Sequence, residues 1–392
     1  MLRVKIAVAL SLFLTLSSSA GHAQQKEPMR IGWVGGRTGG LAETCNPVRE
    51  GISNYFDRVN SQGGIGGKKI EFISRDDEGK PDLAINQAQQ LVLNEKVFAF
   101  VGTCGTPTST ALRDYLREMK ILQFGPISQN DSLGNPETAG RTSFRVLPSD
   151  RNLARNAVTY LEKELGIPSN DIAVLTPAHD TPPARALQGM LLSRGSTFHG
   201  LLEIGWDGSK LPTALEAIRQ QRPRAVIATS VPPTLAKAID SAGSSGNSVW
   251  IFPGLPVGPL TRIHSITVTP VPSTAASLPG VQEFRGLTKS DTSAALMGWI
   301  TAKVFVEGLR RAMPDVTVER TVKGLESLKE FDTGVIGKLT YSENDHQGRT
   351  GGYATESRDG KIVVRDKQLA DACCRDCKPK CEDKCCDDKC RE

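Results

Sequence analysis

The chain has 392 residues, which is long for one hydrophobic core and enough for two lobes. With 39% hydrophobic and 23% charged residues, its composition is that of an ordinary soluble globular protein. The net charge of +5 with interspersed signs argues against a nucleic-acid-binding protein, and an aromatic content of 5% argues against stacking surfaces for bases.

The first residues predict export. Arg3 and Lys5 precede an apolar run at residues 6–16, and the small residues Gly21 and Ala23 follow it. This order is typical of a secretory signal peptide, which we assign to residues 1–23. An uncleaved membrane anchor is the alternative, although the apolar run is short for a bilayer span. No cysteine directly follows the run, so we expect a periplasmic protein without a lipid anchor, in a compartment where disulfides persist.

From residue 29 onward, short apolar strands alternate with amphipathic helices. A first series predicts strands at residues 30–34, 69–75, 97–101 and 121–124, with helices at 47–60, 81–94 and 108–119. A second series predicts helices at residues 152–165, 184–193, 211–221, 234–242 and 293–312, with strands at 171–175, 201–204, 225–229 and 249–252.

This alternation predicts an α/β protein whose parallel sheets carry helices on both faces. One large doubly wound domain would give the same pattern. The break between the strand that ends near Phe124 and the new series beyond Arg145 favours two lobes. Residues 255–277 are rich in Pro, Ser and Thr, and we interpret them as a crossover between the lobes rather than a regular element.

Ligands of open parallel sheets bind at the carboxyl ends of the strands. The loops at these ends are rich in Gly, Pro, Ser or Thr, so their N–H groups and hydroxyls can approach a ligand. They are residues 35–45, 102–107, 125–130, 176–183, 230–233 and 253–258. Several lead into a helix, whose N-terminus favours an anion. Each loop alone could be a simple turn, but six of them together indicate a binding site.

Four segments of the first third share the wording and spacing of one known family. They are residues 31–40 (IGWVGGRTGG), 59–70 (VNSQGGIGGKKI), 75–81 (RDDEGKP) and 100–102 (FVG). This part of the chain resembles the branched-chain amino-acid and amide-binding proteins of ABC importers. The resemblance implies the fold of a type I periplasmic binding protein, with two doubly wound Rossmann-like lobes joined by three crossover strands.

The same resemblance implies a division of the chain and a closing motion. Residues 29–147 and 270–335 would form the N-terminal lobe, and residues 148–269 and 336–366 the C-terminal lobe. Residues 367–392 would be a Cys-rich tail without a counterpart in the family. The lobes would close on a ligand about hinges near residues 144–148, 267–272 and 333–338.

The resemblance also implies ligand-binding residues. In the first lobe the ligand's carboxylate would be held at Gly105 and Thr106, with further contacts from Ser128 and Gln129. The remaining positions predicted to contact the ligand are Arg37, Thr38, Thr44, Asp180, Thr181, Val231 and Leu255. Arg37 is interpreted either as a clamp for an anion or as a solvated loop arginine.

Leu255 stands where amino-acid binders of this family carry an acidic residue for the ligand's ammonium group. A buried ammonium without a carboxylate is unfavourable, so a carboxylate, an amide or a small aromatic acid fits these residues better than a standard amino acid. Glu43 or Asp180 could replace the missing acid from another direction.

An enzyme is not expected. His179 and Asp180 could suggest an acid–base pair, but no Ser or Cys nucleophile signature is near them, and the five histidines have no metalloprotease spacing. We therefore expect a monomeric receptor that needs no cofactor, binds a small polar molecule and passes it to an ABC permease in the inner membrane. The alternative is a ligand- or metal-sensing receptor that uses its tail to bind metal.

The nine cysteines form two sets. Cys45 and Cys104 lie on strand-end loops that we expect to be neighbours, and we predict a disulfide between them; two separate buried thiols are the alternative. The other seven cysteines lie in the tail, separated only by charged residues and one proline; they are Cys373, Cys374, Cys377, Cys381, Cys385, Cys386 and Cys390. They could bind Zn²⁺ or Cu⁺, or they could form disulfides with one thiol left over.

Overall fold

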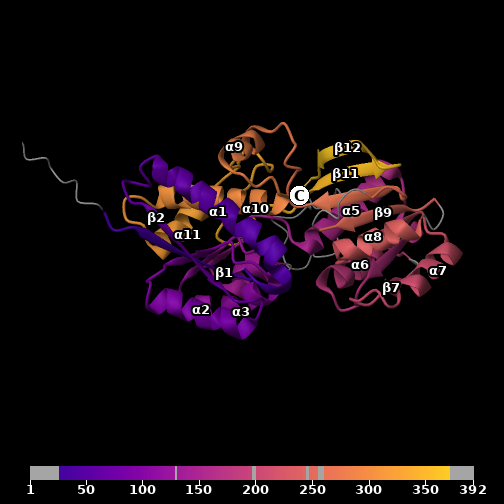
Figure 1. Cartoon of the computed structure of the whole chain (residues 1–392), viewed down its shortest axis with the longest axis horizontal. Coiled ribbons are helices and arrows are strands. Elements are labelled where there is room, and N and C mark those ends of the chain that lie inside the picture. Colours follow the sequence, from indigo (N-terminus) through magenta and orange to yellow (C-terminus); the bar gives the residue numbers. More distant parts are fainter. Residues whose placement is uncertain (1–25, 129, 197–199, 244–246, 255–259, 371–392) are drawn as a thin grey trace, which may run out of the picture.

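The computed structural model describes residues 26–128, 130–196, 200–243, 247–254 and 260–370. The predicted signal peptide and the seven tail cysteines lie outside these residues. The described chain forms two α/β lobes that lie side by side (Figure 1). In the described residues, no helix combines the length and the apolar character needed to cross a membrane.

The first lobe is built on a five-stranded parallel sheet with the order β2-β1-β3-β4-β5. Its strands are β1 Met29–Gly35, β2 Ile70–Asp76, β3 Ala99–Val101, β4 Leu122–Phe124 and β5 Ser143–Phe144. Its helices are α1 Ala42–Ser61, α2 Pro81–Leu93, α3 Thr106–Glu118, α4 Pro136–Ala139, α9 Pro279–Leu287, α10 Ser293–Ala312 and α11 Val318–Glu326. One apolar core lies between the sheet and α1 and α10, and a smaller one lies beneath α2 and α3.

The second lobe is built on a seven-stranded sheet with the order β12-β11-β10-β9-β8-β6-β7. Its strands are β6 Ile172–Thr176, β7 Leu201–Glu203, β8 Ala225–Ala228, β9 Val249–Pro253, β10 Ser265–Thr269, β11 Tyr353–Arg358 and β12 Lys361–Gln368. Its helices are α5 Asp150–Leu165, α6 Pro182–Ser193, α7 Leu211–Gln221 and α8 Pro233–Ala242. β6 to β10 are parallel, whereas β11 and β12 form an antiparallel hairpin on one edge.

The interpretation of residues 255–277 as a crossover without regular structure was wrong for one part. β10 pairs with β9 on one side and with β11 on the other, so it lies inside the second sheet. Its side chains alternate, and Ile266 and Val268 are fully buried in the core beneath α5. β-branched residues suit such a strand, and this short alternation was hidden by the surrounding Pro, Ser and Thr.

The chain passes between the two cores three times. The first passage follows β5, since Leu147 belongs to the first core and Leu153 to the second. The second passage lies between Val268 and Val271. The third lies further along the chain than residues 333–338, because Tyr341 and Tyr353 are still buried in the first core and Ala354 belongs to the second.

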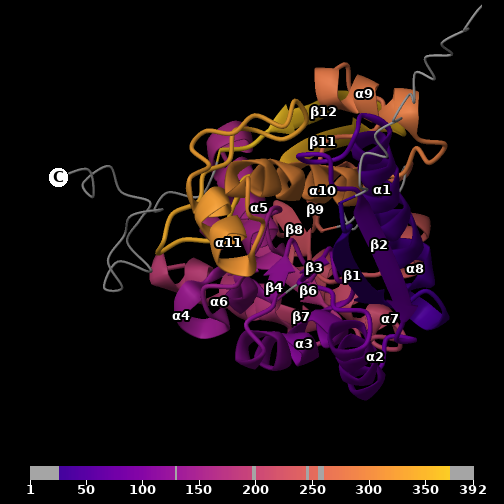
Figure 2. The same ribbon diagram turned by 90° about the vertical axis from the view of Figure 1, so that its left-hand side faces the viewer.

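Two glycines bring α1 and α10 into close contact, and Figures 1 and 2 show the two helices lying together over the first sheet. A Cβ atom on Gly51 would lie 1.9 Å from the carbonyl oxygen of Ala295. A Cβ on Gly298 would lie 2.0 Å from the carbonyl oxygen of Val48. Each glycine thus makes room for the other helix's backbone, although α10 is more than 200 residues away in the sequence.

We expect Gly51→Ala to lower the free energy of unfolding by about 2 to 3 kcal/mol, since the added methyl group must push the helices apart. Gly189→Ala is the matched control, because a Cβ on this α6 glycine would meet nothing within 4 Å. The free energy of unfolding of this control variant is expected to rise by about 0.5 to 1 kcal/mol, because Ala favours the helix more than Gly does. Urea unfolding of both variants measures the difference; equal stability of Gly51→Ala and the parent protein would contradict this helix contact.

Candidate ligand-binding site

The carboxyl ends of both parallel sheets face the other lobe. β5 ends at Phe144, and six residues later the chain begins α5 of the second lobe at Asp150. In the same way β10 ends at Thr269, and Val271 already belongs to the first core. Because neighbouring strands run parallel, the loops after β1, β3 and β4 face the loops after β6, β7 and β8. A ligand site at the strand ends therefore lies between the lobes.

On the first lobe, three strand-end loops join into a continuous edge. Cys104 forms parallel bridges with Gly35 on one side and with Ile127 on the other. The N–H of Gly105 donates to the carbonyl oxygen of Ile127 at 3.0 Å, and the N–H of Ile127 donates to that of Thr103 at 2.8 Å. Gly105 has a φ of 111°, and a Cβ there would lie 2.8 Å from Leu41 Cδ1, so the turn into α3 requires glycine.

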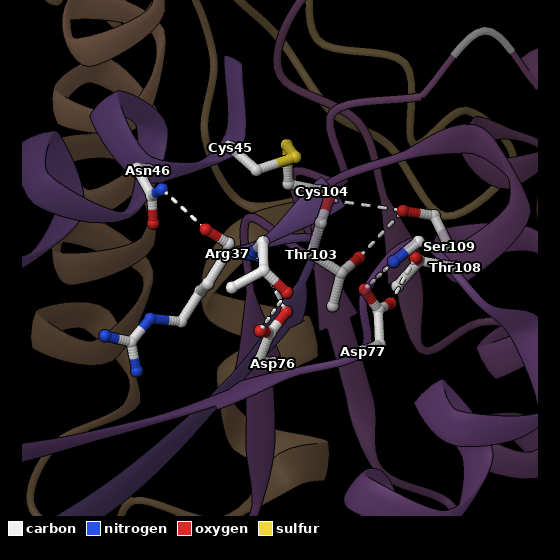
Figure 3. The surroundings of a disulfide bond; sticks show 11 residues. Arg37, Cys45, Asn46, Asp76, Asp77, Thr103, Cys104, Thr108 and Ser109 are labelled. Atoms are coloured by element: carbon white, nitrogen blue, oxygen red, sulfur yellow. Dashed lines mark hydrogen bonds between the residues drawn. A yellow bond between two sulfur atoms is a disulfide. The ribbon is translucent and has the colours of Figure 1, made fainter. Parts of the chain in front are cut away.

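The predicted disulfide is confirmed (Figure 3). Cys45 lies in the first turn of α1 and Cys104 in the loop after β3, with Cα atoms 5.5 Å apart. Both cysteines are buried. The disulfide therefore ties the N-terminal turn of α1 to the middle of the strand-end edge, where the predicted ligand-binding residues lie.

A carboxylate at the end of β2 orders the first loop. Asp76, labelled in Figure 3, accepts hydrogen bonds from the N–H of Arg37 at 2.8 Å and from the hydroxyl of Thr38 at 2.7 Å. Partial burial favours a higher pKa for Asp76, but hydrogen bonds from Glu78, Thr38 and Arg37 outweigh it and lower this pKa below its usual value. Thr38, which we predicted to contact the ligand, is thus engaged in holding its own loop.

A second carboxylate, Asp77, is fully buried behind the edge. It accepts hydrogen bonds from the N–H of Gly79 at 2.8 Å and from the hydroxyl of Thr108 in the first turn of α3. Burial raises the pKa of Asp77, and these two hydrogen bonds oppose that shift. Nearby, the hydroxyls of Thr103 and Ser109 lie 3.0 Å apart. This buried network fixes the start of α3 against the sheet, and sequence reasoning missed it.

The predicted first-lobe residues lie together on neighbouring loops. Arg37 is exposed, and its side chain points away from the disulfide in Figure 3. Thr44 is half-buried in the first turn of α1, and Thr106 is half-buried as the first residue of α3. Ser128 follows β4 on the same edge, and its hydroxyl accepts a hydrogen bond from the N–H of Asn130. Gln129 lies outside the described residues.

On the second lobe, the predicted residues follow two strands of the facing edge. Asp180 is exposed, and its carbonyl oxygen accepts two hydrogen bonds from Arg185. Thr181 is buried at the start of α6. Val231 follows β8 and packs against the core beneath α7 and α8. Leu255, at the position of the missing acid, lies outside the described residues.

Neither a catalytic group nor a metal site is apparent in the described part of the chain. His179 is exposed, and its Nδ1 lies 3.4 Å from a carboxylate oxygen of Glu203, which also pairs with Lys210. This arrangement is a surface ion-pair cluster. The described residues contain no group of three or more His, Cys, Asp or Glu side chains that could hold a metal ion.

Trp206 is a site candidate that sequence reasoning missed. It follows β7, so it lies at the edge that faces the first lobe, and 60% of its surface is exposed. The other three tryptophans, Trp33, Trp250 and Trp299, are fully buried. A tryptophan in a short polar loop between two glycines was the available signal, because such a loop offers no core for a large ring.

Two lobes with facing strand ends and three chain passages define the architecture of a type I periplasmic binding protein. A family model described as periplasmic binding protein matches residues 28–361. The chain belongs to this family, whose members are non-enzymatic binding proteins. This confirms the fold class, the family resemblance and the expectation that the protein is not an enzyme.

Two named proteins are similar in sequence to this chain. A protein of Pseudomonas aeruginosa named amino acid binding protein is 32% identical over 146 residues, which cover 37% of this chain and 37% of that protein. The Leu/Ile/Val-binding protein BraC3 of Rhizobium johnstonii is 23% identical over 364 residues, which cover 86% of this chain and 93% of that protein. The first match thus spans little more than a third of its relative.

Solved structures share the fold at low sequence identity. A branched-chain amino-acid ABC transporter protein of Thermus thermophilus with bound valine has a TM-score of 0.73 at 18% identity, covering 89% of this chain and 97% of that one. A possible leucine/isoleucine/valine-binding protein of Rhodopirellula baltica has a TM-score of 0.72 at 19% identity, covering 90% and 98%.

We expect Asp76→Asn to lower the free energy of unfolding by about 1 to 2 kcal/mol at pH 7, since the neutral amide accepts hydrogen bonds less strongly. The native-state pKa of Asp76 lies below its unfolded value of about 3.9, so this stabilisation is complete above about pH 5, declines as the pH falls through the unfolded pKa and is lost below the native pKa. Urea unfolding between pH 7 and pH 3 should show the gap between variant and parent closing in acid.

Asp82→Asn is the control for this prediction, because Asp82 is an exposed carboxylate in the same lobe. Its substitution is expected to lower the free energy of unfolding by about 1 kcal/mol or less, through the lost interaction with the N-terminus of α2. A destabilisation by Asp76→Asn that stays constant down to pH 3 would show that the carboxylate charge does not hold the first loop.

Proposed function

We propose that this protein is a periplasmic receptor that binds a small polar molecule (a carboxylate, an amide or an amino-acid-like molecule) between its lobes and delivers it to an ABC permease. The observation that carries the proposal is the joined strand-end edge of the first lobe, from which α3 starts at Thr106. The N-terminus of a 13-residue helix favours an anion, and the half-buried Thr106 can add a hydroxyl donor. The names of the relatives, several of which bind branched-chain amino acids, support a ligand of amino-acid size.

The chain says less about the part of the ligand that does not bind at the start of α3. Leu255 cannot pair with an ammonium, so a carboxylate, an amide or a small aromatic acid remains the favoured class. Glu43 in the first turn of α1 and Asp180 on the second lobe are exposed carboxylates at the facing edges. Either of them would accept an ammonium group and extend the range to amino acids.

We propose that the receptor works by hinge closure as a monomer. The ligand would bind the ordered first-lobe edge, and rotation about the chain passages would bring the second-lobe edge onto it. Export by the N-terminal segment would place the receptor in the periplasm, where the closed form would dock on the permease.

A screen with valine, leucine, acetamide and benzoate tests the proposal. A ligand that closes the lobes is expected to change the tryptophan fluorescence, because Trp206 is the exposed tryptophan of the four and lies on a closing edge. Trp206→Phe should remove the change while calorimetry still detects binding. Thr106→Ala should weaken the binding about tenfold or more, the usual effect of losing a hydrogen bond to a charged group.

Thr138→Ala is the control, because Thr138 lies in the same lobe on the short α4, away from the strand-end edge. If none of the four compounds raises the melting temperature or gives heat on titration, the proposed ligand class is wrong. Binding that is equally tight in Thr106→Ala and in the parent would contradict the placement of the ligand at α3.

A second proposal concerns the tail, where seven cysteines fall within residues 373–390. We propose that the reduced tail binds Zn²⁺ or Cu⁺ independently of the lobes. Truncation after Ala370 keeps Leu369, which is buried against the second core, and removes all seven thiols. Native mass spectrometry of the reduced protein should show metal on the full chain and none on the truncated one, with unchanged small-molecule affinity. Absence of metal from both would end the proposal.

A further inference from the structure

Arg145 is a buried cation at the point where the chain leaves the first lobe. It directly follows β5, and only 3% of its surface is exposed. Its two terminal nitrogens bind the loop that follows β4: Nη1 donates to the carbonyl oxygen of Asn130 at 2.8 Å, and Nη2 donates to that of Ser128 at 2.9 Å. The guanidinium fork therefore holds the main chain at Asn130 and at Ser128, the second of which is a predicted ligand-binding residue.

Burying a guanidinium is unfavourable unless its environment compensates for the lost water. Burial lowers the pKa of Arg145, and the negative charges of Asp131 and Asp150 oppose that shift. Its direct partners are two main-chain carbonyls, whose position a planar, five-donor fork can define better than a single ammonium. A side chain used in this way specifies the path of a loop.

The main chain of Arg145 also forms hydrogen bonds, and its partners belong to the third passage between the lobes. Its N–H donates to the carbonyl oxygen of His346 at 2.9 Å. Its own carbonyl oxygen accepts from the N–H of Gly348 at 2.8 Å and from the hydroxyl of Tyr341 at 2.8 Å. One residue thus joins the ligand-side loop, the first passage and the third passage.

We propose that Arg145 is a positioning residue that couples the main chain at Ser128 and Asn130 to the hinge, so that ligand binding and lobe closure stabilise each other. This inference rests on the proposed function. Any hinge rotation near the first passage shifts the Arg145 main chain relative to residues 346–348, and the fork transmits that shift to the loop carbonyls. Coupling between two sites is reciprocal, so if the hinge angle affects the loop, a ligand that orders the loop favours one hinge angle by the same free energy.

The coupling is tested from both ends by amide hydrogen exchange on the ligand-free protein. Arg145→Lys keeps the charge but cannot span two carbonyls, and it should speed exchange at residues 126–134 and also at residues 345–349. Tyr341→Phe removes one hydrogen bond at the hinge end without touching the fork, and it should speed exchange at residues 126–134 as well. Arg117→Lys is the matched control, since Arg117 also donates to a first-lobe carbonyl, that of Thr138 at 3.1 Å, away from the passages.

A purely structural Arg145 would give a different result. If Arg145→Lys affects residues 126–134 alone, or if Tyr341→Phe leaves that loop unchanged, the coupling is overturned. Tyr341→Phe keeps the test decisive if the Arg145 variant does not fold.

Calorimetry adds a second readout with whichever of valine, leucine, acetamide or benzoate binds the parent protein. Arg145→Lys should weaken that binding by about fivefold to about 150-fold, the usual range for coupled sites, while Arg117→Lys should not. Unchanged affinity in Arg145→Lys would overturn the coupling. If the parent binds none of the four compounds, the proposed ligand class fails, and the exchange experiment decides the role of Arg145 by itself.

Discussion

The parallel direction of the strands is the constraint on which the site depends. All strands of a parallel sheet end on one edge, so the loops after β1, β3 and β4 must lie together, and the chain must leave the lobe from that edge. The same rule applies to β6 to β10 of the second lobe. Connecting two such sheets through their strand ends turns the edges toward each other. The strand-end edges and the chain passages are therefore neighbours by topology, before any side chain is considered.

Many polar main-chain and side-chain groups lie at the strand-end edge of the first lobe, and they need hydrogen-bond partners within the protein. Groups that are paired in this way are not available to a ligand. The first lobe pairs groups from different loops: Asp76 holds the first loop, Asp77 holds the start of α3, and Arg145 holds the loop after β4. The disulfide between Cys45 and Cys104 adds a covalent tie across the same edge. These contacts reduce the conformational freedom that a ligand would otherwise have to restrict, which favours binding.

The sequence predicts the parts of this structure that depend on local pattern. Strand–helix alternation locates most elements, and the neighbouring loops predict the disulfide. The β11–β12 hairpin was missed, although Asp359-Gly360 is a strong two-residue hairpin signal. Thr38 and Asp77 each depend on a partner 30 or more residues away in the sequence. Arg145 depends on two main-chain carbonyls. Neither periodicity nor spacing reveals such pairings.

The two facing edges differ in how firmly they are held, and this difference suggests an order of events. Backbone hydrogen bonds join the loops of both edges, and the first-lobe edge also carries a disulfide and two hydrogen-bonded carboxylates. Under the proposed function, the first-lobe edge would therefore need little rearrangement to receive a ligand. The second-lobe edge presents exposed side chains, Trp206 and Asp180 among them, whose solvent-exposed surface a ligand or the first lobe could cover. A ligand that first fills the rigid edge replaces water there at little entropic cost, and it then offers the second lobe a surface to cover. In the proposed closure, the exposed ring would be buried, and its apolar surface would add to the stability of the closed form.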